Sequence, residues 1–184
     1  IVENLMGIRR VKGSIQKGKK PILINHLKLI IDTINQQKTE EIKKLRDKSL
    51  ILVGFGGGFR RTELVSIDYQ DLEFVPEGLK ITIKKSKTDQ FGEGMIKGLP
   101  YFTSDNYCPV KNLNKWIEIS KIKSGPIFRR FSKGLSLTNK RLTDQSVVLL
   151  IKKYLNLAGM ENKNFAGHSL RSGFATVAAE SGAD

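Results

Sequence analysis

The segment from Gly54 to Leu64 reads GFGGGFRRTEL and separates two kinds of hydrophobic pattern. On its N-terminal side, apolar residues recur every three or four positions, which is typical of amphipathic helices. On its C-terminal side, within residues 79–84, apolar residues alternate with lysine and threonine, the period of a half-buried strand. A chain that changes period at this point is expected to pass from a helical layer into a small sheet.

The glycines of this segment do not match a nucleotide-binding phosphate loop. They follow a helix-like stretch instead of a strand, no Gly-Lys-Ser/Thr sequence ends the cluster, and no acidic ribose partner follows in a βαβ unit. We interpret the cluster as a helix break that begins at Gly54 and lets the backbone turn tightly before Arg60.

The remaining pattern predicts an α+β fold that is mainly α, with a small three-stranded antiparallel sheet. Helices are expected over residues 22–34, 40–53, 60–67, 110–122, 143–158 and 168–179. Strands are expected over residues 72–74, 79–83 and 95–99. Beyond the sheet we expect only helices, with Pro109 at the start of one and Thr143 as the N-cap of the next.

The composition excludes several classes of protein. The 184 residues include 32 lysines and arginines against 18 aspartates and glutamates, a formal net charge of +14, and such an excess usually has a polyanionic partner. Cys108 is the single cysteine, which excludes a disulfide framework and a cysteine-rich zinc site. No apolar run approaches the roughly 20 residues of a membrane helix, so we expect a cytoplasmic protein with no membrane partner.

Three separated motifs carry residues that suit phosphate chemistry. The first is GFRRTEL, in which Arg60 and Glu63 are three residues apart and share a helical face. The second is SKTD, which contains Lys87 and follows a strand. The third is GHSLR, in which His168 and Arg171 point the same way from the start of a helix, where unpaired N–H groups attract anions.

Taken in this order, the three motifs resemble the tyrosine recombinase (phage-type integrase) family. Its catalytic domain shows an arginine in a Gly-x-Arg-x-Ser/Thr-Glu-Leu turn, then a lysine on a β-hairpin, then His-x-x-Arg. The resemblance covers the chain from about Lys19 to the end. It implies that residues 1–17 are the tail of an N-terminal core-binding domain and a basic linker, and that residues 18–184 are a catalytic domain that lacks its C-terminal segment.

The resemblance also implies a chemistry, in which a tyrosine hydroxyl attacks a DNA phosphodiester and leaves a 3′-phosphotyrosine. Arg60 and Arg171 would clamp the non-bridging oxygens, since guanidinium groups stay charged and bind bidentately. His168 would move a proton or hold a phosphate oxygen, Lys87 would protonate the departing 5′-oxygen, and Glu63 would orient the arginines. Because the covalent intermediate stores the bond energy, no cofactor and no metal are expected.

Plainer interpretations exist for each residue. Lys85 is the alternative to Lys87 as the general acid. If Lys85 does not have this role, we expect it to contact DNA, and we expect Arg61 to contact DNA as well. Arg60 and Glu63 could form an ordinary surface pair, and His168 could cap a helix or lie in the core. The presence of all three motifs in family order favours the catalytic interpretation.

The nucleophile of the family has no counterpart in this sequence. The four tyrosines, at positions 69, 101, 107 and 154, all precede Arg171, whereas the family's tyrosine lies well beyond it. The first residue is Ile1, not a methionine. We therefore expect either a piece of a longer protein or a decayed copy, and in both cases no DNA cleavage by residues 1–184 alone.

Three functions follow as hypotheses. The first is a site-specific recombinase or integrase that acts on double-stranded DNA, as a homo-multimer on paired sites in the full-length protein, with residues 1–184 alone largely monomeric. The second is a non-catalytic, basic DNA-binding remnant of a decayed integrase. The third, an RNA-binding protein, is disfavoured because the sequence shows no aromatic platform motif.

Overall fold

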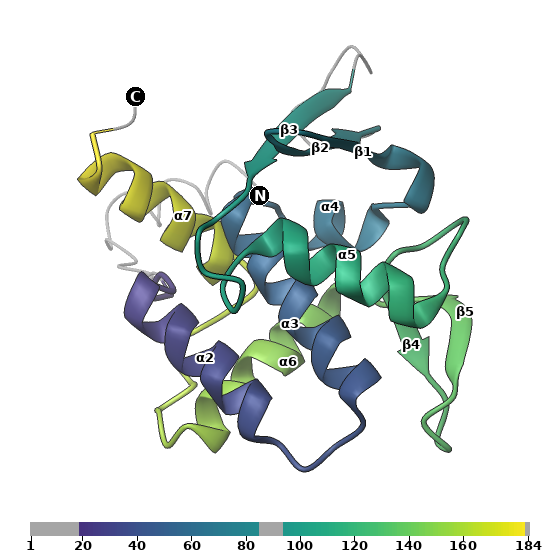
Figure 1. Ribbon diagram of the computed structural model, residues 1–184. Coiled ribbons are helices and arrows are strands. Elements are labelled where there is room, and N and C mark those ends of the chain that lie inside the picture. Colours follow the sequence, from purple (N-terminus) through teal and green to yellow (C-terminus); the bar gives the residue numbers. More distant parts are fainter. Residues whose placement is uncertain (1–18, 85–93, 183–184) are drawn as a thin grey trace, which may run out of the picture.

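The computed structural model describes residues 19–84 and 94–182, which contain six α-helices, a short 3-10 helix and five strands (Figure 1). The helices are α2 (Ile24–Gln36), α3 (Glu41–Gly56), α4 (Arg61–Ser66), α5 (Pro109–Ser120), α6 (Asp144–Leu157) and α7 (Ser169–Glu180), with η1 at Tyr69–Asp71. The strands are β1 (Leu72–Val75), β2 (Gly78–Ile83), β3 (Met95–Pro100), β4 (Arg129–Phe131) and β5 (Leu137–Arg141). The expected α+β class, mainly helical, is confirmed.

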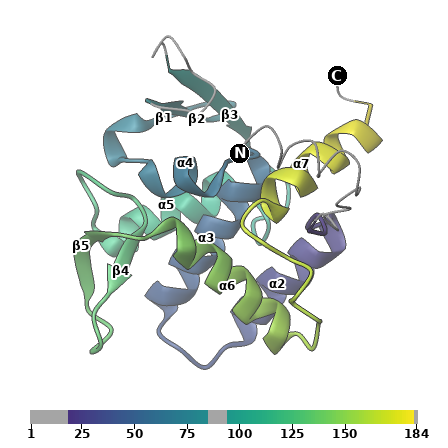
Figure 2. The ribbon, with the colours of Figure 1, turned by 180° about the vertical axis from the view of Figure 1, so that it is seen from behind.

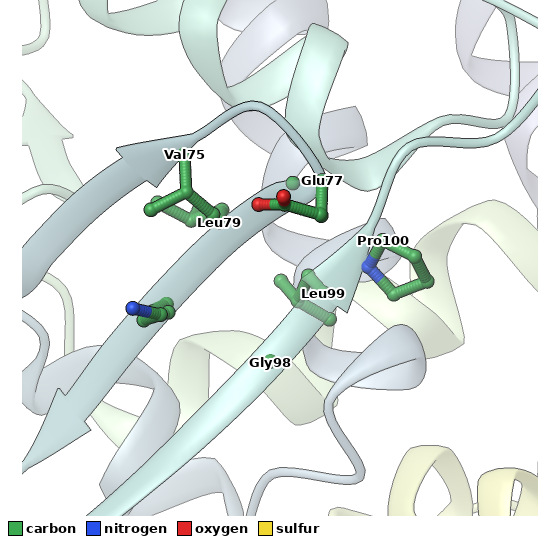
Figure 3. Close-up of a pocket in the computed structure, with 8 residues that line it drawn as sticks. Val75, Glu77, Leu79, Gly98, Leu99 and Pro100 are labelled. Atoms are coloured by element: carbon green, nitrogen blue, oxygen red, sulfur yellow. The ribbon is translucent and has the colours of Figure 1, made fainter.

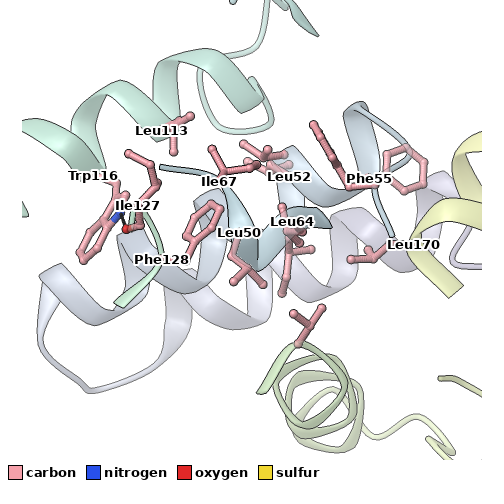
Figure 4. Close-up of a cluster of buried hydrophobic side chains, with 14 of the residues drawn as sticks. Leu50, Leu52, Phe55, Leu64, Ile67, Leu113, Trp116, Ile127, Phe128 and Leu170 are labelled. Carbon is pink, nitrogen blue, oxygen red and sulfur yellow. Dashed lines mark hydrogen bonds between the residues drawn. The ribbon is translucent and has the colours of Figure 1, made fainter. Parts of the chain in front are cut away.

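Helix α3 forms the centre of the molecule. Every residue from Leu45 to Phe55 is buried, as expected for a helix that is covered on all sides. Figures 1 and 2 show α5 on one side of α3 and α6 on the other, and α2 and α7 also contact it. In Figure 4 the α3 side chains lie between Trp116 and Phe128 at one end of the core and Leu170 at the other.

The three-stranded sheet has the expected strands and the expected antiparallel order, β1-β2-β3. On β2, Leu79, Ile81 and Ile83 are buried while the residues between them are exposed. Because side chains alternate along a strand, Lys97 and the buried Leu99 lie on the same face of β3. This register directs a lysine toward the protein interior.

The hairpin of β4 and β5 corrects the expectation that only helices follow the sheet. The two strands pair antiparallel with an irregular register. They are short and mostly polar, so they lack the alternation that indicates a strand in a sequence. Long-range contacts hold the hairpin instead: Arg141 Nη1 donates to the carbonyl oxygen of Val65 at 2.6 Å, and its Nη2 pairs with Asp68.

The end of α3 also differs from the expectation, because the helix continues through Gly54 to Gly56. A Cβ atom at Gly54 would lie 2.8 Å from Leu64 Cδ2 and 3.0 Å from Leu170 Cδ1. Gly54 is therefore a packing residue at which α4 and α7 approach α3. The backbone reverses later, at Gly58, whose φ of +54° lies in the left-handed region.

Some expectations concern residues outside the described ranges. These are residues 1–17, expected to be a domain tail and a basic linker, and the SKTD loop with Lys85 and Lys87. Among the described helices, none combines the length and apolarity needed to cross a lipid bilayer.

Candidate active site

Arg60 and Glu63 form a closed unit at the start of α4. Arg60 is the N-cap residue and Glu63 is the third residue of the helix, a spacing that lets the carboxylate reach back to the cap. Glu63 Oε2 accepts from the Arg60 backbone N–H at 3.0 Å, and Oε1 accepts from Arg60 Nη1 at 2.6 Å. The Arg60 side chain remains 22% exposed while that of Glu63 is 5% exposed. The carboxylate therefore holds the guanidinium from the protein side.

Arg171 reaches the same region from α7. Its Nη1 donates to the carbonyl oxygen of Gly58 at 3.0 Å, two residues before Arg60. The start of α7 is fixed by close backbone packing, since a Cβ at Gly173 would lie 1.9 Å from the carbonyl oxygen of Ile22. The Ile22 backbone N–H also donates to the Ser169 carbonyl oxygen at 2.9 Å. The structure thus brings both candidate arginines to one turn.

Lys97 lies beneath this turn and was missed at the sequence level. Its Nζ donates to the carbonyl oxygens of Gly57 at 2.6 Å and Gly58 at 3.3 Å, and it lies 4.8 Å from the centre of the Phe59 ring. Burial lowers the pKa of Lys97, and the nearby positive charges of Arg171 and Arg60 lower it further, while Glu63 opposes the shift. The signal that could have revealed Lys97 is its position, two residues before buried Leu99 on the inward face of a strand.

His168 lies at the N-terminal end of α7, as its motif predicts. It is the N-cap residue, its carbonyl oxygen accepts from the Ser172 backbone N–H at 2.9 Å, and the residue is exposed. It precedes Arg171 by less than one helical turn, which places both on the end of α7 that faces the Gly58 turn.

Arg61 points toward α6. Its Nε pairs with Asp144 Oδ2 at 3.0 Å, and both side chains are more than a third exposed. Gly167 packs against it, since a Cβ there would lie 2.7 Å from Arg61 Cδ. Its predicted contact with DNA stays a prediction, as do the roles of Lys85 and Lys87.

The electrostatic balance of the site favours an anion. Three cationic side chains, those of Arg60, Arg171 and Lys97, lie around the turn, and the carboxylate of Glu63 acts on two of them, Arg60 and Lys97. Donors that are already charged and oriented bind phosphate oxygens more strongly than neutral donors do.

Two hollows in the described surface are lined by none of these candidate residues. One, of about 460 Å³, lies against the sheet near the turn between β1 and β2 and is lined by Val75, Leu79 and Leu99 among others (Figure 3). The other, of about 520 Å³, is an apolar groove lined by residues of α2, α7 and the end of β3, including Ile24 and Phe174.

The chain is similar in sequence to known proteins. The family model described as "Phage integrase family" matches residues 23–184. An integrase/recombinase XerD homologue of Selenomonas ruminantium is 48% identical over 176 residues, which cover 96% of this chain and 51% of the relative. The tyrosine recombinase XerD of Corynebacterium glutamicum is 30% identical and is covered to 48%. The chain spans about half the length of these curated relatives.

Solved structures show the same fold at low sequence identity. The XerH site-specific recombinase bound to palindromic difH substrate superposes with a TM-score of 0.66 at 17% identity, over 90% of this chain and 44% of that one. The lambda integrase catalytic core gives a TM-score of 0.61 at 16% identity, over 89% and 84% of the two chains.

The helical layers around α3 and the small antiparallel sheet define the catalytic-domain fold of tyrosine recombinases. The chain belongs to the phage integrase family, whose model matches it from residue 23 to residue 184.

Proposed function

We propose that this chain is the catalytic domain, from about residue 18 onward, of a protein that cleaves and rejoins double-stranded DNA at specific sites in the cytoplasm. The main support for this proposal is that Arg60 and Arg171 lie at one turn. Glu63 holds Arg60 there, and the Gly58 carbonyl oxygen accepts a hydrogen bond from Arg171. The DNA-bound state of a similar recombinase, XerH on its difH substrate, supports duplex DNA as the partner.

In the proposed reaction a tyrosine oxygen forms a bond to phosphorus as the bond from phosphorus to the 5′-oxygen breaks. Arg60 and Arg171 stabilise the charge that gathers on the non-bridging oxygens. His168 holds a phosphate oxygen or moves a proton, and Lys87, with Lys85 as its rival, gives the 5′-oxygen its proton. Rejoining reverses these steps and needs no metal or cofactor.

The attacking tyrosine is proposed to lie beyond Arg171 in the complete protein, since the tyrosines of this chain all precede Arg171. Action on paired DNA sites as a homo-multimer is part of the same proposal. A lambda integrase dimer bound to its core site, similar in fold to this chain with a TM-score of 0.61, supports it.

The test uses a duplex with a nick near the cleavage site, so that the cut strand diffuses away and the covalent adduct accumulates. The substrate is selected from a random duplex library by binding to the protein encoded by the complete reading frame. An adduct that resists denaturing detergent is expected, and Arg171→Ala should lower its rate of formation by about 100- to 1,000-fold. Residues 1–184 alone should bind the duplex and form no adduct.

The alternative, a non-catalytic DNA-binding remnant, gives a different outcome. A stop codon soon after Asp184, together with salt-sensitive duplex binding and no adduct, would replace the proposed function with this one. Competition by single-stranded RNA at equal affinity would contradict both.

A further inference from the structure

Lys97 occupies a position where a lysine is costly. It lies on the inward face of β3 and is half-buried, two residues before Leu99, which is 2% exposed. Its ammonium group shares this space with the positive charges of Arg60 and Arg171, and burial itself disfavours the charged form. An apolar side chain of similar length would fill the space without this penalty.

The contacts of Lys97 show what the charge does at this position. Nζ donates to two successive backbone carbonyls, those of Gly57 and Gly58, at 2.6 and 3.3 Å. It therefore ties β3 to the turn that ends α3. Gly58 is in the left-handed region, and the Phe59 ring lies against the ammonium at 4.8 Å, so the turn is held on more than one side.

The Gly58 carbonyl is also the acceptor for Arg171 Nη1, at 3.0 Å. A single carbonyl oxygen thus receives donors from β3 and from α7, and the turn that carries it leads directly into Arg60. Any shift of this turn moves Arg60 with its backbone and moves the acceptor that orients Arg171. The turn thus links the positions of the two guanidinium groups, although Arg60 is the N-cap of α4 and Arg171 lies on α7.

We propose that Lys97 is a positioning residue, whose ammonium fixes the Gly57–Gly58 carbonyls so that Arg60 and Arg171 face one phosphate. The proposal rests on the proposed function, since it is the cleavage reaction that needs both guanidinium groups to face the same phosphate. Lys97 does not touch the phosphate; it acts through the turn and adds positive charge behind the arginines.

The test compares three variants. Lys97→Met removes the donors and keeps the length, Lys97→Arg keeps charge and donors, and Lys80→Met removes the same charge from an exposed position of the same sheet. The first readout is the ¹⁵N resonance of the Arg171 guanidinium in residues 1–184, assigned with Arg171→Lys. We expect it to shift in Lys97→Met, to return toward the wild-type position in Lys97→Arg, and to stay unchanged in Lys80→Met.

The second readout is the rate of adduct formation by the complete protein at saturating nicked duplex. Lys97→Met should lower this rate by about 10- to 100-fold, because a small misplacement of a positioning group is enough to do so. The duplex dissociation constant should change no more than it does in Lys80→Met. Urea denaturation of each variant separates misplacement from unfolding.

The outcomes distinguish the two proposals. If the wild-type protein forms no adduct, the proposed function fails, while the Arg171 resonance still decides whether Lys97 orients that side chain. If the wild type forms the adduct and Lys97→Met matches it in rate and in the Arg171 resonance, the role of Lys97 is overturned.

Discussion

Among the described residues, two arginine–carboxylate pairs have the same nitrogen–oxygen distance of 2.6 Å and different surroundings. Arg46 and Asp47, on α3, are buried, with side chains 7% and 0% exposed. Arg60 and Glu63, at the start of α4, leave the arginine 22% exposed. The distance alone does not separate a structural pair from a candidate catalytic pair, whereas burial of the arginine does.

The partners of the buried pair explain its role. Arg46 donates from Nε and Nη2 to Asp47 and from Nη1 to the carbonyl oxygen of Arg129, and its guanidinium lies 4.8 Å from the centre of the Phe131 ring. Tyr154 donates its hydroxyl to the other carboxylate oxygen of Asp47 at 2.6 Å. This cluster joins α3, α6 and β4. Each of the donors named here has its hydrogen-bond acceptor within the protein, as expected for a structural pair.

The largest expected effect is on the free energy of unfolding, which should fall more when the carboxylate of the buried pair is removed than when that of the pair of Arg60 and Glu63 is removed. Asp47→Ala should lower the free energy of unfolding by about 3–5 kcal/mol, because it leaves the Arg46 charge buried without its partner. Glu63→Ala should cost less, about 1–2 kcal/mol, since Arg60 can be hydrated and the main loss is the contact that caps α4. Urea denaturation followed by circular dichroism measures both. Equal losses would contradict the distinction.

An intermediate effect is expected at Tyr154. Tyr154→Phe removes a buried hydrogen bond to a charged group and should cost about 1.5–3 kcal/mol at neutral pH. Burial, with the charge and hydrogen bond of Asp47 next in importance, raises the pKa of Tyr154 far above the usual value. The free energy of unfolding of the variant is compared with that of the wild type at each pH. The two proteins differ only in the Tyr154 hydroxyl, so the other titrating groups cancel in the difference.

The direction of the pH dependence follows from this shift. The folded-state pKa of Tyr154 lies above the unfolded-state value of about 10, so the associated stability is complete below about pH 10. It is lost as the pH rises further, because the unfolded chain releases the proton first. The stability difference between wild type and Tyr154→Phe should therefore shrink between about pH 10 and 11. A difference that grows over this range would rule out the buried neutral hydroxyl.

The smallest effect is expected for the exposed pair of Arg61 and Asp144. Both side chains are more than a third exposed, so Asp144→Ala should change the free energy of unfolding by less than about 0.5 kcal/mol. If Arg61 contacts the DNA backbone, releasing it from Asp144 should leave duplex affinity unchanged or slightly higher, as fluorescence anisotropy would show. If Asp144→Ala instead lowered the free energy of unfolding by several kcal/mol, this pair would be a structural pair like that of Arg46 and Asp47.

The sequence by itself determined the helical segments, the three-stranded sheet and the order of the motifs that contain Arg60, His168 and Arg171. These features are local, because burial of one face imposes a period of 3.6 or 2 residues and a motif needs only its own neighbours. Their catalytic roles, like those of Lys85 and Lys87, remain predictions.

Only the tertiary structure decided the hairpin of β4 and β5, the packing role of Gly54, the partner of Arg61 and the position of Lys97 beneath the Gly58 turn. Arg171 and its acceptor Gly58 are 113 residues apart, and Lys97 and Gly57 are 40 apart. No local period encodes which side chain meets which carbonyl over such separations. That choice is made when α3, α4, α7 and the sheet pack together, because only then does each buried polar group find its partner.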